Sequence, residues 1–270
     1  MTEARLQETL TYAPGTFCWI ELSTTDANAS KQFYTTLFGW EYDDHQVSPE
    51  MVYSLLKLNG KEAGGLFELT PEMLSQGVPT AWLSFVSVKN ADETASKAKA
   101  NGATLLKGPF DVMDVGRMAV IQDPTGAVFA IWEAGKRQGA AIVNVTNSFC
   151  WNELATPNTS AAGEFYTTLF GWDKKVQNFG SMPYTSFLNG EKPAGGMFTP
   201  APEMGNIPPN WLVYFAVDDC DAKAEEAKGI GATTIVPPSD IPGVGRFAVI
   251  QDPQGGTFGI IKLDQPPSKG

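Results

Sequence analysis

The sequence has little histidine, little cysteine and little positive charge. Its 270 residues include one histidine, His45, and three cysteines, an odd number that does not match a disulfide framework. Lysine and arginine number 19 against 30 acidic residues, which gives a formal net charge of −11. Nucleic acids and anionic membranes are bound through basic patches, so we expect neither as a partner. The acidity suits a neutral or cationic small molecule, or simply keeps a cytosolic protein soluble.

Long hydrophobic runs and the common catalytic motifs are missing as well. No apolar run is long enough to span a bilayer, and the start, MTEARLQETLTYAPG, has no apolar signal core. We therefore expect a cytoplasmic protein. The sequence contains no G-x-S-x-G motif and no P-loop, and a serine triad would have to use His45.

A long internal repeat is the strongest feature that is present. Residues Phe17 to Trp40 read FCWIELSTTDANASKQFYTTLFGW, and residues Phe149 to Trp172 read FCWNELATPNTSAAGEFYTTLFGW. Fifteen of the 24 aligned residues are identical without a gap, which indicates a duplicated structural unit. We expect a loosely held leader over residues 1–15, a first module over 16–133, a linker over 134–147, a second module over 148–263 and a tail over 264–270.

The hydrophobic pattern predicts an α+β fold for each module. Alternation over 17–23 predicts a strand, and apolar positions at Ala29, Phe33 and Leu37 predict a helix that ends at Gly39. Strand-like segments follow, and the polar residues 42–46 are expected to be variable in conformation. The second half of the module begins with another strand and continues with a helix over 91–101. Further along, an Asp-Pro-x-Gly turn joins two strands as a hairpin. Most strands are therefore expected to be antiparallel, with segments 70–79 and 200–209 as loops.

These motifs resemble the vicinal oxygen chelate superfamily. The resemblance is carried by D-x-x-x-S-x-x-FY-x-x-LFGW, by the A-GG segment, and by VGR-x-AVIQDP-x-G-x-x-F, over 16–133 and 148–263. The superfamily includes glyoxalase I, extradiol dioxygenases, fosfomycin-modifying enzymes and bleomycin-resistance proteins. The resemblance implies paired βαβββ units in two modules, each a curled eight-stranded sheet around its own cup.

Metal chemistry in that superfamily uses ligands that this sequence does not carry. The resemblance places the family's metal ligands at three positions in each module, and these hold Trp19, Leu83 and Ala130 in the first and Trp151, Leu212 and Gly259 in the second. None of these side chains binds a divalent cation. Because His45 is the only histidine, we expect no two-histidine, one-carboxylate iron site, no zinc or nickel site, and no cofactor.

Glu21 and Glu153 are the candidate catalytic residues. Each is the only carboxylate of its first strand, on the same face as Trp19 or Trp151, and the resemblance implies that this face lines the cup. A carboxyl there could act as a general acid or base or hold a cationic group. The structural alternative, which is slightly favoured, is a carboxylate paired with an arginine or with backbone amides.

The candidate ligand-binding residues are aromatic or arginine. They are Trp19, Trp151, Phe85, Tyr214, Arg117 and Arg246. The aromatic rings suit a flat organic ligand, although wall or core packing is the commoner use of such residues. The two arginines could grip a carboxylate or phosphate, or else bond to carbonyls or to the glutamates.

Three functions remain open. The first is a metal-independent protein, monomer or homodimer, that binds a small organic molecule. The second is an enzyme, a lyase, isomerase or hydroxylase acting on a small carbonyl or polyketide-like substrate, with Glu21 or Glu153 as base. If the chain is an enzyme, the resemblance implies lyase or oxidoreductase chemistry. The third is a structural or interaction protein whose cups are filled by its own side chains.

Overall fold

The computed structural model describes residues 10–179 and 182–265, and within them two modules have the same architecture. The first module contains β1 (Phe17–Thr24), α1 (Ala27–Phe38), β2 (Glu41–Ser48), β3 (Met51–Leu58), β4 (Lys61–Glu68), α2 (Pro71–Ser75), β5 (Ala81–Val88), α3 (Ala91–Ala100), β6 (Thr104–Val112), β7 (Gly116–Gln122) and β8 (Val128–Ala134).

The second module repeats this order with one change. It contains β9 (Phe149–Ala155), α4 (Thr159–Phe170), β10 (Asp173–Phe179), β11 (Met182–Asn189), β12 (Lys192–Phe198), the short 3₁₀ helix η1 (Pro202–Met204), β13 (Asn210–Ala216), α5 (Cys220–Gly229), β14 (Thr233–Ile241), β15 (Gly245–Gln251) and β16 (Thr257–Leu263). The 3₁₀ helix takes the place of α2.

The ends of the first helix follow from its sequence. The Asp26 side chain accepts a hydrogen bond from the Ala29 amide, and Gly39 takes the left-handed conformation after the last turn. Phe33 and Leu37 are buried on one side of α1, in a cluster that also contains Ile20 and Leu22 of β1. The predicted apolar stripe and the predicted helix end are both confirmed.

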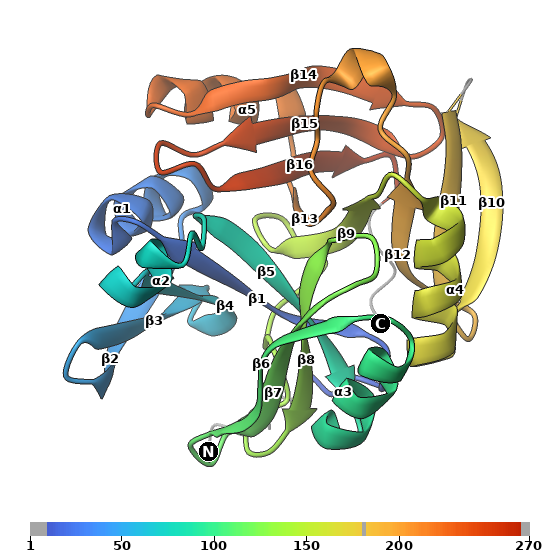
Figure 1. Cartoon of the computed structure of the whole chain (residues 1–270). Coiled ribbons are helices and arrows are strands. Elements are labelled where there is room, and N and C mark those ends of the chain that lie inside the picture. The colour runs from blue at the N-terminus through green and yellow to red at the C-terminus, as the bar shows by residue number, and fades with distance from the viewer. Residues whose placement is uncertain (1–9, 180–181, 266–270) are drawn as a thin grey trace, which may run out of the picture.

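Each module forms one eight-stranded mixed sheet, and the two sheets have the same strand order. The first reads β2-β3-β4-β1-β5-β8-β7-β6 and the second β10-β11-β12-β9-β13-β16-β15-β14. Neighbours are antiparallel except where β1 meets β4, β5 meets β8, β12 meets β9 and β13 meets β16. The sheets curl, and the helices pack on their outer faces, so the predicted α+β architecture is confirmed (Figure 1).

The two modules pack crosswise through their helices. Figure 1 shows α1 beside α5 at one end of the molecule and α3 beside α4 at the other. Phe38 of α1 contacts Phe215 of β13, with ring centroids 4.9 Å apart, and Phe129 of β8 contacts Tyr166 of α4 at 5.5 Å. Each first helix therefore packs against the second half of the other module, as well as against its own sheet.

Several local expectations are corrected. Residues 42–46, which were expected to be variable in conformation, belong to the regular edge strand β2. All residues of β2 are exposed, and His45 pairs there with Tyr53 of β3. The segments expected to be plain loops contain α2 and η1. Residues 1–9 of the expected leader lie outside the described part of the chain. Gly15, near its end, is fixed by two hydrogen bonds: its amide donates to the Ser87 carbonyl, and its carbonyl accepts from Trp172 Nε1.

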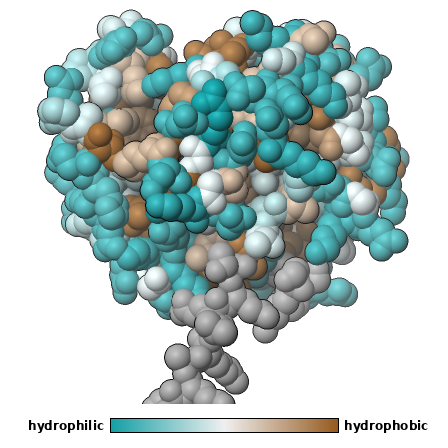
Figure 2. Space-filling view, turned by 90° about the horizontal axis from the view of Figure 1, so that it is seen from below, coloured by the Kyte–Doolittle hydropathy of each residue, from teal (hydrophilic) through white to brown (hydrophobic). Residues whose placement is uncertain are grey.

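The face shown in Figure 2 is mostly hydrophilic, with apolar residues in small separate groups. In the described part of the chain, no helix is both long and apolar enough to cross a membrane.

Candidate functional site

The face of each sheet that carries no helix brings the candidate residues together. In the first module, Trp19 of β1 stands opposite Phe85 of β5, which in turn pairs with Ala130 of β8. Trp151, Tyr214 and Gly259 form the equivalent row in the second module. Since paired residues on adjacent strands point to the same side, each row lies across the middle of one helix-free face. We call these the module 1 face and the module 2 face.

Glu21 sits beside this row and is held by a tyrosine. The Tyr53 hydroxyl donates to Glu21 Oε2 at 2.7 Å, and Trp19 Nε1 donates to the same hydroxyl at 3.2 Å. Glu21 is partly buried, between Gly65 of β4 and Leu83 of β5. A tyrosine hydroxyl, and not the arginine or backbone amides of the structural alternative, therefore holds this carboxyl.

Glu153 is held by two tyrosines. The Tyr214 hydroxyl donates to Glu153 Oε2 at 2.8 Å, and Tyr184 also hydrogen-bonds this carboxyl. Trp151 Nε1 donates to the Tyr184 hydroxyl at 3.1 Å, as Trp19 does to Tyr53. The same Trp-Tyr-Glu chain of hydrogen bonds therefore occurs on both faces.

Sequence reasoning missed Tyr53 and Tyr184, although the repeat contained a signal for them. Both tyrosines precede the duplicated A-GG segment. A Cβ at Gly65 would overlap the Tyr53 hydroxyl, and a Cβ at Gly196 would overlap that of Tyr184. The second glycine of each pair therefore lets a tyrosine from β3 or β11 cross the neighbouring strand and reach the glutamate. Paired glycines within a strand are typical of a bulge or a close backbone approach, but they do not show which side chain comes close.

Burial changes the pKa values of Glu21, Glu153 and Tyr53. Desolvation raises the pKa of Glu21 to about 7, against the Tyr53 hydrogen bond and the charge of Lys107, which lower it. Burial likewise raises the pKa of Glu153, against its two tyrosine hydrogen bonds. Burial and the adjacent Glu21 also raise the pKa of Tyr53 well above its usual value. Tyr53 is therefore a hydrogen-bond donor at neutral pH, and Glu21 can gain or lose a proton there.

Two cations that sequence reasoning did not select lie near the module 1 network. Lys107 of β6 acts on the charge of Glu21 although β6 stands four strands from β1, which shows how strongly the sheet curls toward this face. Arg137, from the segment between the modules, lies over the Trp19 ring at 5.7 Å and forms a two-pronged ion pair with Glu62 at 2.9 and 3.0 Å.

Arg117 and Arg246 lie outside both faces and bond to aspartates, so the alternative in which they pair with the glutamates is wrong, while their role in ligand binding stays a prediction. Val120 pairs with Ala130 and therefore points to the module 1 face. Arg117 is three residues before Val120 on the same strand, and side chains an odd number of residues apart point to opposite sides, so Arg117 points away from that face. Arg117 instead bonds Asp92 of α3 at 2.8 Å and Asp111 of β6 at 2.8 Å. Arg246 makes the matching bonds to Asp221 and Asp240.

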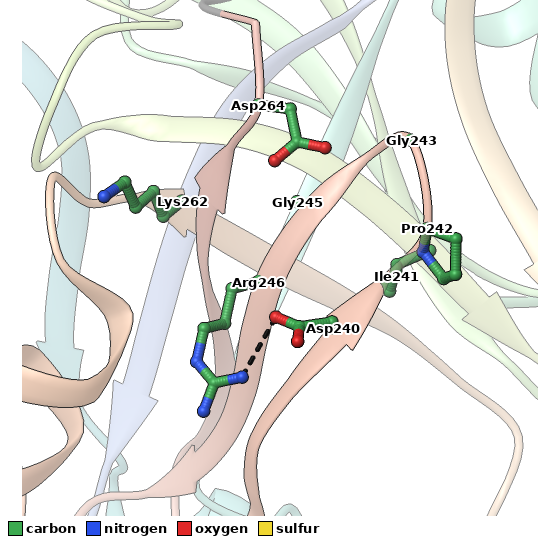
Figure 3. Close-up of a pocket in the computed structure, with 8 residues that line it drawn as sticks. All are labelled: Asp240, Ile241, Pro242, Gly243, Gly245, Arg246, Lys262 and Asp264. Atoms are coloured by element: carbon green, nitrogen blue, oxygen red, sulfur yellow. Dashed lines mark hydrogen bonds and ion pairs between the residues drawn. The ribbon is translucent and has the colours of Figure 1, made fainter.

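The outer side of the second module carries a polar hollow of about 320 Å³. It is lined by Asp240, Ile241, Pro242, Gly243, Gly245, Arg246, Lys262 and Asp264, at the β14–β15 turn and the end of β16 (Figure 3). The Arg246 guanidinium points at Asp240, and this ion pair neutralises its charge. The hollow is therefore separate from both Trp-Tyr-Glu networks.

The helix-free faces do not fit a metal ion. The positions where the resemblance places metal ligands carry indole, alkyl and glycine groups, and around them each network offers only one carboxylate. In the parts of the chain that the structure describes, no three His, Cys, Asp or Glu side chains are grouped closely enough to hold an ion. The chemistry available there is hydrogen bonding, proton transfer and aromatic contact.

Known proteins resemble the chain in sequence and in fold. The family model described as "Glyoxalase/Bleomycin resistance protein/Dioxygenase superfamily" matches residues 16–131 and 145–260. The chain is 40% identical over 253 residues to the "Putative glyoxylase CFP32" of Mycobacterium tuberculosis, covering 93% of this chain and 96% of that protein. It is 31% identical over 262 residues to the "Anthracycline biosynthesis protein DnrV" of Streptomyces peucetius, covering 93% and 94%.

The solved structures with a similar fold include a Mn(II)-bound glyoxalase from Novosphingobium aromaticivorans, with a TM-score of 0.63, 16% identity and coverage of 94% of this chain and 85% of that one. The 2,3-dioxygenase LapB from Pseudomonas sp. KL28 also has a TM-score of 0.63, with 11% identity and 96% of both chains covered. At such low identity these likenesses concern the fold alone. The family match over both modules and the 40% identity carry the assignment: the chain belongs to the glyoxalase/bleomycin resistance protein/dioxygenase superfamily, with two tandem modules.

Proposed function

We propose that the helix-free faces are binding sites for a small, flat organic molecule and that they act without a metal held by this chain. The observation that carries the proposal is the Trp-Tyr-Glu chain of hydrogen bonds, which occupies the centre of both faces where the resemblance would place metal ligands. The partly exposed Trp151 and Phe247 beside the carboxyl of Glu153 suit a planar molecule with at least one oxygen or nitrogen, whereas Trp19, Phe85 and Tyr214 are buried.

Aromatic side chains and a half-buried acid define the ligand class. On the module 2 face, the Tyr214 and Phe247 rings lie 6.4 Å apart, and Trp151 is partly exposed. Tyr214 is buried, but the partly exposed Trp151 and Phe247 rings can stack on a planar molecule, and the carboxyl offers a hydrogen bond to a hydroxyl or carbonyl. The relative named for anthracycline biosynthesis makes a fused-ring polyketide a reasonable first ligand to test.

A second candidate function is proton transfer on a carbonyl substrate. It is favoured by Glu21, because a carboxyl whose pKa is about 7 can serve as acid or base at neutral pH. The relative called a putative glyoxylase supports a small carbonyl compound as substrate. This function needs the same face and would add chemistry to binding. The third function, a protein whose faces are filled by its own side chains, would show no ligand at all.

Titration with a fluorescent anthracycline such as daunorubicin tests the proposal. We expect saturable binding that quenches tryptophan fluorescence and is unchanged by excess EDTA. Leu83 and Leu212 are partly exposed and stand opposite Glu21 and Glu153, so Leu83→Trp and Leu212→Trp should each obstruct one face. Each variant should weaken binding at its own site by about tenfold or more. An exposed control, Leu74→Trp, should bind normally.

Two results would count against the proposal. Binding that is lost in EDTA would show that a metal is needed. No saturable binding of daunorubicin or of a panel of planar phenols and quinones would favour faces filled by their own side chains.

A further inference from the structure

The two modules place the same glutamate at the same point of the sheet but surround it differently. Glu21 accepts one protein hydrogen bond, from Tyr53 at 2.7 Å. Glu153 accepts from Tyr214 at 2.8 Å and is also bonded by Tyr184. The duplicated carboxyls therefore differ in how much of their hydrogen-bonding capacity is left over for another molecule.

A coupled pair of substitutions between the modules produces this difference. Tyr214 stands where the first module has Phe85, and Gly259 stands where it has Ala130. A Cβ at position 259 would overlap the Tyr214 ring, so this ring lies over a strand position that has no side chain. Phe85 carries no hydroxyl, and Ala130 has the methyl group that would block the equivalent ring position.

The second oxygen of Glu21 is open. Glu21 Oε1 has no hydrogen bond within the described residues. In that same part of the chain, the one side-chain oxygen or nitrogen that is both buried and unpartnered is Thr80 Oγ1. Glu21 Oε1 must therefore reach solvent-accessible space, on a residue that is itself only partly buried. A ligand on the module 1 face can meet this oxygen.

The charges around Glu21 suit a group that changes its protonation state. Lys107 on β6 stabilises the carboxylate, while Leu83 and Phe85 of β5 and Ala130 of β8 offer only apolar contact. The Arg137 guanidinium, above Trp19, is neutralised by Glu62. In the second module Val236 occupies the position of Lys107, since Val236 pairs with Val249 as Lys107 pairs with Val120.

We infer that the duplicated sites have divided their roles: Glu21 exchanges a proton with the ligand of the module 1 face, whereas Glu153 is a positioning carboxylate held by two tyrosines. This rests on the proposal that both faces bind ligands. Protonated Glu21 passes its proton from Oε1 to a carbonyl or phenolate oxygen of the ligand. The carboxylate that remains keeps the Tyr53 hydrogen bond and is stabilised by the charge of Lys107, and the reverse transfer returns the proton.

A test that needs no ligand uses dicyclohexylcarbodiimide, an apolar reagent that adds to protonated, accessible carboxyl groups. We expect mass spectrometry of the treated full-length protein at about pH 6.5 to find Glu21 modified about tenfold faster than Glu153 or more. The rate at Glu21 should fall as the pH rises through about 7. Equal rates, or faster modification of Glu153, would overturn the inference.

Exchanging the surroundings provides matched controls. Phe85→Tyr combined with Ala130→Gly gives the first module the residues of the second, and should slow modification of Glu21. Tyr214→Phe removes one tyrosine from Glu153 and should speed its modification. If either variant misfolds, a pH titration of the unmodified protein followed through the ¹³C NMR signals of the glutamate carboxyls replaces it. The Glu21→Gln and Glu153→Gln variants assign these signals. Glu21 must then titrate near pH 7, and absence of that titration contradicts the inference whether or not daunorubicin binds.

Discussion

At the scale of single residues, the acidity of Glu21 is set by competition between burial and hydrogen bonding. Burial disfavours the charged form, whereas Tyr53 and Lys107 favour it, and burial prevails. The folded protein therefore keeps a proton on Glu21 that the unfolded chain releases above about pH 4.5. Since the folded state binds more protons between pH 4.5 and 7, the free energy of unfolding contributed by this group decreases as the pH rises across that window.

Glu21→Gln should remove that pH dependence. Near pH 4 the variant and the parent should be about equally stable, because Glu21 is protonated in both states of the parent. At pH 8 the variant should be more stable, by on the order of 2 to 3 kcal/mol, because the parent then carries a buried charge. Urea denaturation at both pH values measures this, with the exposed Glu50→Gln as control. A loss of stability at pH 8 would show that the carboxylate itself stabilises the fold.

At the scale of elements, strands β4 and β12 are shaped by the side chains that cross them. The first glycine of each pair lies close to a neighbouring backbone carbonyl, Gly64 against Ile20 and Gly195 against Asn152. The second glycine leaves room for the tyrosine that bonds the glutamate. Each pair therefore joins the packing of a strand to the construction of the site, which explains why it appears in both modules.

Gly65→Ala should displace Tyr53 from Glu21. The overlap with the tyrosine hydroxyl should cost about 1 to 3 kcal/mol of stability. The same substitution in a Tyr53→Ala background should cost clearly less, because the ring it collides with is gone. Gly229→Ala is the control, since a Cβ there would meet nothing within 4 Å and alanine favours a helix. Equal costs in the two backgrounds, measured by thermal unfolding, would rule out the collision as the cause.

At the scale of the whole molecule, matching hydrogen-bond chains tie the modules together. The Tyr34 hydroxyl donates to Asp252 Oδ2 at 2.8 Å and accepts from Trp82 Nε1 at 3.0 Å. Tyr166, Asp123 and Trp211 form the reciprocal chain in the other direction. Both aspartates also hold their own Asp-Pro-x-Gly turns, through the amides of Thr125 and Gln254. Buried hydrogen bonds therefore join the two modules in both directions.

Calorimetry should accordingly show one unfolding transition for the full chain, with equal calorimetric and van't Hoff enthalpies. Tyr34→Phe and Tyr166→Phe each remove a buried hydroxyl that serves two partners, and each should cost about 1 to 3 kcal/mol. The transition should move as a whole in both variants. Tyr42→Phe, at an exposed position of β2, should change little. A variant in which one module melts before the other would contradict this unity.

The sequence by itself determined the duplication, the fold class and the direction of side chains along each strand. Alternation in FCWIEL placed Trp19 and Glu21 on one face and Leu22 on the helix side, and the structure agrees. Gly39 was readable as the end of the first helix. These features depend on interactions between residues a few positions apart, so the local pattern contains the information needed. The equivalence of the two halves followed directly from the repeat.

Only the tertiary structure decided which side chains meet. Tyr53 and Glu21 are 32 residues apart, and Tyr34 and Asp252 are 218 apart, so their hydrogen bonds depend on strand order and on how the modules pack. The ion-pair partners of Arg117 were missed for the same reason, because they lie on α3 and β6. A strand pattern gives the side of the sheet that a residue faces only after the register of the whole sheet is known. The partners of a buried charge depend on that register and on the curl of the sheet, which no local pattern contains.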